Sequence, residues 1–147
     1  MLIIKNTKED FKMKFNKLIP ELSVTNIEDS KNFYINILGF KLEYERKEDK
    51  FAFLSYNGSQ IMIEEVNNHW SVGELIYPFG RGINFQIECE NVDALSKNLK
   101  ENNIPIYKDV FESRYRADNI VYIEKELLVQ DLDGYLLRFQ QTLKESD

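Results

Sequence analysis

The side chains best suited to covalent or metal chemistry are scarce in this sequence. It holds one histidine, His69, and one cysteine, Cys89. A transition-metal site needs several converging His, Cys or carboxylate donors, and a cysteine nucleophile needs a nearby base. His69 has no second His or Cys at ligand spacing, and Cys89 follows an apolar alternation. We therefore expect His69 in a loop and Cys89 packed against a helix.

A charged residue near the C-terminus is more informative. In the stretch VQDLDGYLLRFQQ, Arg138 stands among apolar residues of a predicted strand that follows a tight turn. Asp131 and Asp133 belong to that turn, where aspartate side chains bond the nearby backbone. We therefore interpret the two acids as turn formers and not as an acid–base pair.

Composition excludes several classes of function. The 147 residues are 43% hydrophobic and 30% charged, which fits one globular domain or two half-domains that share a core. A formal net charge of -6 argues against nucleic-acid binding. The longest apolar runs fall far short of the ~20 residues of a membrane helix, and the N-terminus lacks the pattern of a signal peptide. We expect a cytoplasmic protein.

The first half predicts one strand, one helix and three further strands. Residues 18–24 alternate as a strand, in which Pro20 cannot donate a ladder hydrogen bond. The following residues place apolar side chains at helical spacing, with Thr25 or Asn26 as N-cap and Gly39 as the stop. FKLEYER, KFAFLSY and SQIMIEEV predict three strands, and YNGS predicts a hairpin turn between the last two.

The second half repeats this order. INFQIEC predicts a strand, ENVDALSKNLKENN a helix, and IPIYKDVF, NIVYIEKELLVQ and YLLRFQQ further strands. Superposing Val24 on Cys89 aligns NIE with NVD at the two helix starts. The expected divisions are an N-terminal extension (1–17), a first module (18–66), a linker (67–82), a second module (83–141) and a C-terminal tail (142–147).

The two βαβββ patterns resemble the vicinal oxygen chelate superfamily, which includes glyoxalase I, extradiol dioxygenases and the fosfomycin- and bleomycin-resistance proteins. The segments LSVTNIEDSKNFYINILGF and LLVQDLDGYLLRF carry the resemblance, which runs from about Leu18 to Gln141. It implies an α+β fold whose two sheets form a cup with the chemistry on its inner walls. Metal-dependent members place one ligand on each of four strands.

The positions in this chain that match those ligands are Ile19, Glu64, Asn84 and Arg138. Strand alternation turns Glu64 and Gln86 toward the cup. A guanidinium stays protonated and offers no acceptor, so Arg138 cannot bind a cation, and Ile19 has no donor atom. We therefore expect no metal, no cofactor and no catalytic residue, and an ion pair between Glu64 and Arg138 across the cup.

The segment IPELSVTNI resembles the opening of the bleomycin-resistance branch, which sequesters a drug without altering it. In that branch a proline like Pro20 accompanies an exchanged N-terminal strand in an intertwined homodimer. The resemblance implies clefts between subunits, where flat ligands stack on aromatic rings and acidic groups meet their cationic ends. The ligand-binding residues expected here are Phe53, Glu64, Trp70, Asn84, Gln86, Tyr115, Tyr122 and Arg138.

The leading interpretation is a homodimeric, metal-independent binder of a small aromatic or cationic molecule, with a bleomycin-like drug as one candidate. A metal-dependent lyase, dioxygenase or thiol transferase is the alternative, with a displaced site that uses Glu64 and Asn84, Gln86 or His69. A third hypothesis is an interaction module whose cup is filled by its own side chains. Trp70 fits either ligand contact or loop anchoring.

Overall fold

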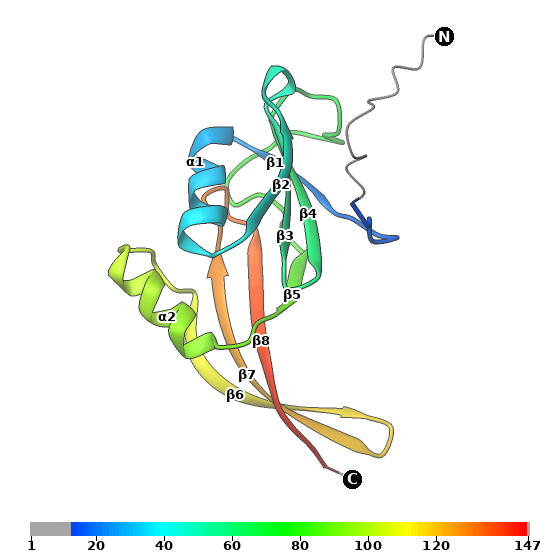
Figure 1. Ribbon diagram of the computed structural model, residues 1–147, viewed down its shortest axis with the longest axis vertical. Coiled ribbons are helices and arrows are strands. Elements are labelled where there is room, and N and C mark those ends of the chain that lie inside the picture. The colour runs from blue at the N-terminus through cyan, green and yellow to red at the C-terminus, as the bar shows by residue number, and fades with distance from the viewer. Residues whose placement is uncertain (1–12, 147) are drawn as a thin grey trace.

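The computed structural model describes residues 13–146 and confirms the α+β fold of two βαβββ modules (Figure 1). The first module comprises β1 (Glu21–Val24), α1 (Ile27–Lys31), the π-helical segment η1 (Asn32–Ile37), β2 (Lys41–Arg46), the 3-10 turn η2 (Lys47–Asp49), β3 (Phe51–Tyr56) and β4 (Ser59–Glu65). The second comprises β5 (Asn84–Glu88), α2 (Val92–Glu101), β6 (Lys108–Ala117), β7 (Ile120–Gln130) and β8 (Leu136–Ser146).

Both sheets have the same topology. Their strand orders are β1-β4-β3-β2 and β5-β8-β7-β6. In each sheet the first strand of the module pairs in parallel with the last, and the remaining pairs are antiparallel. This arrangement sets residues that are distant in sequence opposite each other, such as Ser23 and Glu64, or Gln86 and Arg138.

The two helices begin in the same way, as the sequence alignment of NIE with NVD predicts. The side chain of Asn26 accepts a hydrogen bond from the Asp29 amide, and that of Asn91 accepts one from the Ala94 amide, both at 3.0 Å. Such caps satisfy amide groups that have no partner within the helix. The first helix continues into η1, and the chain then turns at Gly39, whose φ is +92°.

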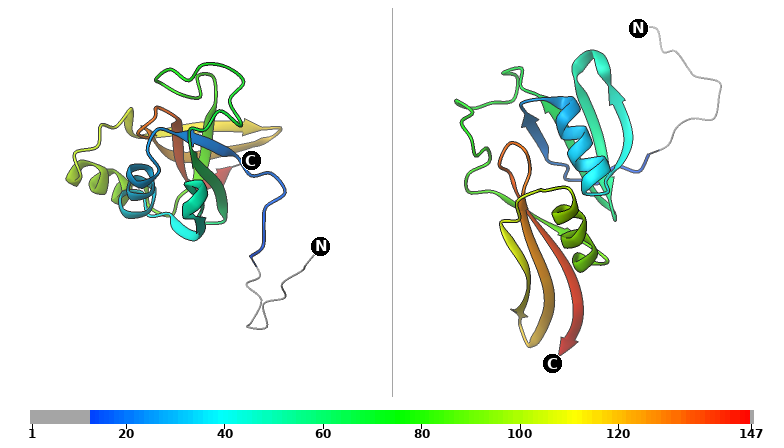
Figure 2. Two further views of the ribbon diagram at one scale, coloured as in Figure 1. Left: turned by 90° about the horizontal axis from the view of Figure 1, so that it is seen from above. Right: turned by 90° about the vertical axis from the view of Figure 1, so that its left-hand side faces the viewer.

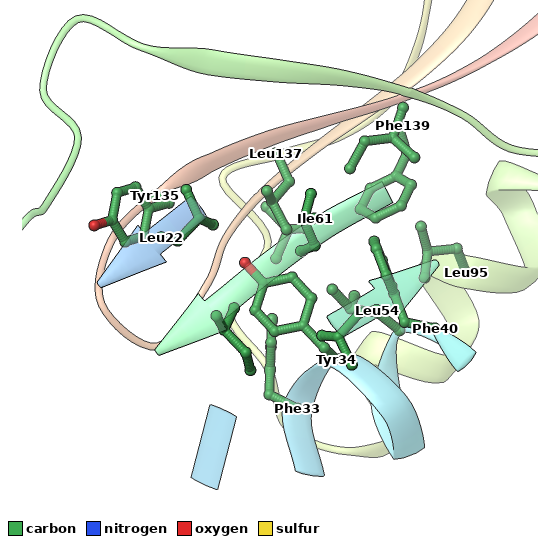
Figure 3. Packing of buried hydrophobic residues seen from close by; sticks show 14 of the residues in the cluster. Leu22, Phe33, Tyr34, Phe40, Leu54, Ile61, Leu95, Tyr135, Leu137 and Phe139 are labelled. Carbon is green, nitrogen blue, oxygen red and sulfur yellow. The ribbon is translucent and has the colours of Figure 1, made fainter. Parts of the chain in front are cut away.

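One core serves both modules. Apolar residues that alternate along the strands turn toward α1 and α2, where Ile61 and Leu54 of the first sheet meet Leu137 and Phe139 of the second (Figure 3). Tyr34, which is fully buried, meets the rings of Phe33 and Phe40 edge-on in this core. Both helices lie on the same side of the two sheets (Figure 2). The opposite side of each sheet, which carries no helix, is called its open face below.

The structure extends the sequence interpretation at three places. β6 and β7 form a long hairpin that continues to the turn at Asp118, and β8 takes in residues 142–146, which had been expected as a tail. Of the expected extension 1–17, residues 1–12 lie outside the described part of the chain. Asn16 is described, and its amide donates to Gln60 of β4 at 2.8 Å. No helix among residues 13–146 has the length and apolar character to cross a membrane.

Candidate functional site

The open faces carry alternate residues of the strands, as period-two alternation requires. On the first sheet they include Glu21, Ser23, Phe51, Phe53, Met62 and Glu64. On the second they include Asn84, Gln86, Ser113, Tyr115, Tyr122, Glu124, Glu126 and Arg138. All the expected ligand-binding residues except Trp70 therefore lie on strands with their side chains on an open face.

Glu64 and Trp70 lie together at the end of β4. They line one cavity of about 580 Å³, along with Glu21, Arg46 and His69. Trp70 is 72% exposed, and Asn67 donates a hydrogen bond to Glu64. Burial, and then the negative charge of Glu64, raise the pKa of Glu21. The cavity thus combines an exposed aromatic ring with carboxylates.

Phe53 lies on the same open face but is covered by other aromatic rings. Tyr44 stacks on it with ring centroids 5.2 Å apart, and Phe15 meets it edge-on at 5.4 Å. Phe53 is only 1% exposed as a result. A ligand would contact Tyr44 or Phe15 before it reached Phe53.

Arg138 lies in the middle of the second sheet, on β8. Its cross-strand neighbours are Gln86 on β5 and Leu128 on β7. The guanidinium donates to Gln86 Oε1 at 2.6 Å. Glu64 is bound to Asn67 instead, so the expected ion pair between Glu64 and Arg138 is absent from the described part of the chain.

Two buried carboxylates beside Arg138 were missed by the sequence interpretation. Glu126 is 1% exposed and Glu124 is 8% exposed. The hydroxyls of Ser113 and Tyr115 donate to Glu126 Oε2 at 2.8 and 2.6 Å. Burial, and then the charge of Glu126, raise the pKa of Glu124, whereas the charge of Arg138 lowers it. Their alternation with Ile123 and Leu127 was visible in the sequence, but charged residues in such a pattern usually face solvent.

The other candidates are distributed as follows. Asn84 begins β5 and is exposed, Tyr122 is half-buried on β7, and Ile19 lies just before β1. Cys89 is buried in the core, as expected, and His69 lies in the loop after β4. Within residues 13–146, no three His, Cys, Asp or Glu side chains are grouped closely enough to hold a metal ion.

The predicted site residues therefore form two groups in one chain. Glu64 of the first sheet lies with Trp70 of the following loop, whereas Gln86, Tyr115 and Arg138 belong to the second sheet. The two sheets share their helix-side core, and both open faces point to the side away from the helices (Figure 2).

Comparison with known proteins identifies the family. The sequence profile of the glyoxalase/bleomycin resistance protein/dioxygenase superfamily matches residues 15–139, which is most of the chain. The chain belongs to this superfamily. No curated protein matches it in sequence.

Several solved structures are similar to the chain. One member from Vibrio splendidus 12B01 is 30% identical, over 84% of this chain and 95% of that one, with a TM-score of 0.39. A glyoxalase/bleomycin resistance protein/dioxygenase from Alicyclobacillus acidocaldarius is 23% identical, over 88% and 92%, with a TM-score of 0.60. TioX from Micromonospora sp. ML1 is 17% identical, over 88% and 100%, with a TM-score of 0.67. The last two similarities concern the fold alone.

Proposed function

We propose that this superfamily member is a metal-independent binding protein of the bleomycin-resistance type, which sequesters a small aromatic, cationic molecule without altering it. The observation that carries the proposal is the cavity shared by Trp70 and Glu64. An exposed indole gives a flat ligand a stacking surface, and neighbouring carboxylates attract its positive charge. Arg138 at the family's final ligand position further supports binding over metal chemistry.

The proposal includes a homodimer in which each cleft combines the first sheet of one chain with the second sheet of its partner. In one chain the two open faces do not cover each other, so a second copy would supply the missing wall. The loop between β4 and β5 supports this because it exposes several large apolar side chains: Trp70, Val72, Ile76, Tyr77 and Ile83. Large apolar side chains are common in protein interfaces.

Calorimetric titration with bleomycin and with flat aromatic cations tests the binding function. Trp70→Ala should weaken binding about ten-fold, as removal of a central aromatic contact does. Its melting temperature should stay nearly unchanged because the side chain is 72% exposed. Tyr107→Ala, which removes another exposed aromatic ring, is the matched control. A large loss of stability with unchanged affinity would contradict a ligand contact at Trp70, and a monomer in analytical ultracentrifugation would contradict the shared cleft.

One observation favours the alternative of a metal-dependent enzyme. His69 and Glu64 line the same cavity, and imidazole and carboxylate both bind divalent ions. Elemental analysis of protein purified without chelator, followed by titration with zinc, nickel, manganese and iron(II), separates the two functions. About one tightly held ion per subunit, with an activity that chelation abolishes, would replace the binding proposal by this one.

A further inference from the structure

The second open face buries charged side chains that are not paired with one another. Glu124 and Glu126 lie two residues apart on β7, and Arg138 lies on the adjacent β8. Both carboxylates are more than nine-tenths buried. Burying a charged group is costly unless it is paired, so a cluster of this kind calls for a function.

Three buried polar atoms of the cluster lack a hydrogen-bond partner among the described residues: Glu124 Oε2, Glu126 Oε1 and Arg138 Nε. The other oxygen of Glu126 is held by two hydroxyl donors, from Ser113 and Tyr115. These bonds fix the orientation of the carboxylate and leave Oε1 as its free acceptor. The guanidinium of Arg138 donates to Gln86 and forms no ion pair with either carboxylate.

The charges and donors of the cluster define what it would bind. Two carboxylates and one guanidinium leave one negative charge in excess, which a single monovalent cation neutralises. The free acceptors are on two separate carboxylates, so a planar group with several N–H donors matches them better than a single point charge does. A divalent metal fits poorly, because Arg138 repels it and only two anionic ligands are present.

We propose that Glu124 and Glu126 form a recognition subsite for an amidinium or guanidinium group of the ligand, with Arg138 Nε donating to an acceptor next to that group. The inference rests on the proposed binding function and names the chemical class that the site selects. Tyr115, which is 40% exposed, borders the subsite, and its hydroxyl holds Glu126 Oε2 so that Oε1 remains free for an incoming N–H donor. An aryl amidine therefore combines an aromatic ring, which can contact Tyr115, with a planar cation, which can bind Glu124 and Glu126.

Titration of the full chain with benzamidine and with its neutral analogue benzamide tests the subsite. Benzamidine should bind at least about ten-fold more tightly, since bonds to a buried charge are the stronger ones. Glu124→Gln and Glu126→Gln should each remove most of that preference while leaving benzamide unaffected. Glutamine keeps an acceptor for Ser113 and Tyr115, so the fold should survive, and melting curves check this. Glu112→Gln, on the same hairpin with a side chain 55% exposed, is the matched control.

A ring-free probe separates this inference from the proposed function. Methylguanidinium should shift the side-chain NMR signals of Gln86 and Arg138, and Glu126→Gln should abolish the shift. That result would support the subsite even if no aromatic ligand bound at Trp70. Equal affinity for benzamidine and benzamide, or a preference that survives both substitutions, would overturn the subsite and leave the Trp70 cleft to its own test.

Discussion

The two open faces differ far more than the modules that carry them. The modules share strand order, the parallel pairing of first and last strands, and an asparagine N-cap. The first open face carries stacked aromatic rings beside its carboxylates, and the preceding segment partly covers it through Phe15 on Phe53. The second is polar and buries Glu124 and Glu126 beside Arg138.

This contrast separates the residues that set the fold from those that set the function. Helix-side positions of both sheets hold apolar residues of one shared core. Open-face positions contribute less to that core, so their chemistry can differ between modules without a change of topology. The predictions that follow test this division, from the largest expected effect to the smallest.

Two neighbouring leucines on β8 test the division most directly. Leu137 is 1% exposed in the core, whereas Leu136 is half-buried on the open face. Leu137→Ala should lower the free energy of unfolding by about 3–5 kcal/mol, because it leaves a cavity in a close-packed interior. Leu136→Ala should cost about 1 kcal/mol, in proportion to its smaller apolar burial. Urea unfolding measures both, and equal losses would contradict the division.

The hydrogen bonds between the two modules provide the second test. Tyr34 donates to Asp131 Oδ2 at 2.6 Å, and Tyr135 donates to the carbonyl of Ser23 at 3.0 Å. Burial raises the pKa of Asp131 from 3.8 to about 6, although its bond from Tyr34 lowers it. A carboxyl group whose pKa is raised by folding stabilises the protein only while it is protonated.

This contribution should therefore be complete below pH 3.8 and should be lost as the pH rises to about 6. The loss amounts to about 3 kcal/mol for a shift of this size. Asp131→Asn should remove that part of the pH dependence and retain the Oδ1 acceptor for the amides of Asp133 and Tyr135. Urea unfolding of both proteins between pH 4 and pH 7 measures the difference. Parallel pH profiles would show that Asp131 does not titrate in this range.

Sequence periodicity predicted the fold because the helix-side positions carry a clear pattern. Ile61 and Ile63 point to the core, and the next residue, Glu64, points to the open face, as alternation requires. Arg138 was likewise placed on the correct side of β8. The placement of Glu64 depends on local alternation, and that of Arg138 depends on the resemblance to the family's last ligand position.

The missed features depend on contacts between strands. Glu124 and Glu126 resemble a solvated edge in sequence, and they are buried because Ser113 and Tyr115 of β6 reach over Glu126. Phe53 was placed on the correct face, but Phe15, from outside its module, covers it. No pattern within one segment contains the identity of its spatial neighbour, so these parts of the site required the structure.

Substitution of Phe15 has the smallest expected effect and tests the difference between the two open faces most specifically. Its ring meets Phe53 at 5.4 Å and Tyr44 at 6.5 Å, yet it remains 53% exposed. Phe15→Ala should lower the free energy of unfolding by about 1 kcal/mol, the worth of such an aromatic contact. Leu18→Ala, at a position 86% exposed, should cost almost nothing and serves as the control.

The same substitution also bears on ligand access. If Phe15 only covers the face, its removal exposes the Tyr44–Phe53 stack, and a flat aromatic cation should bind more tightly, by a factor of about three to ten for one added aromatic contact. Weaker binding would instead make Phe15 part of the ligand site, and the two open faces would then differ in chemistry but not in accessibility.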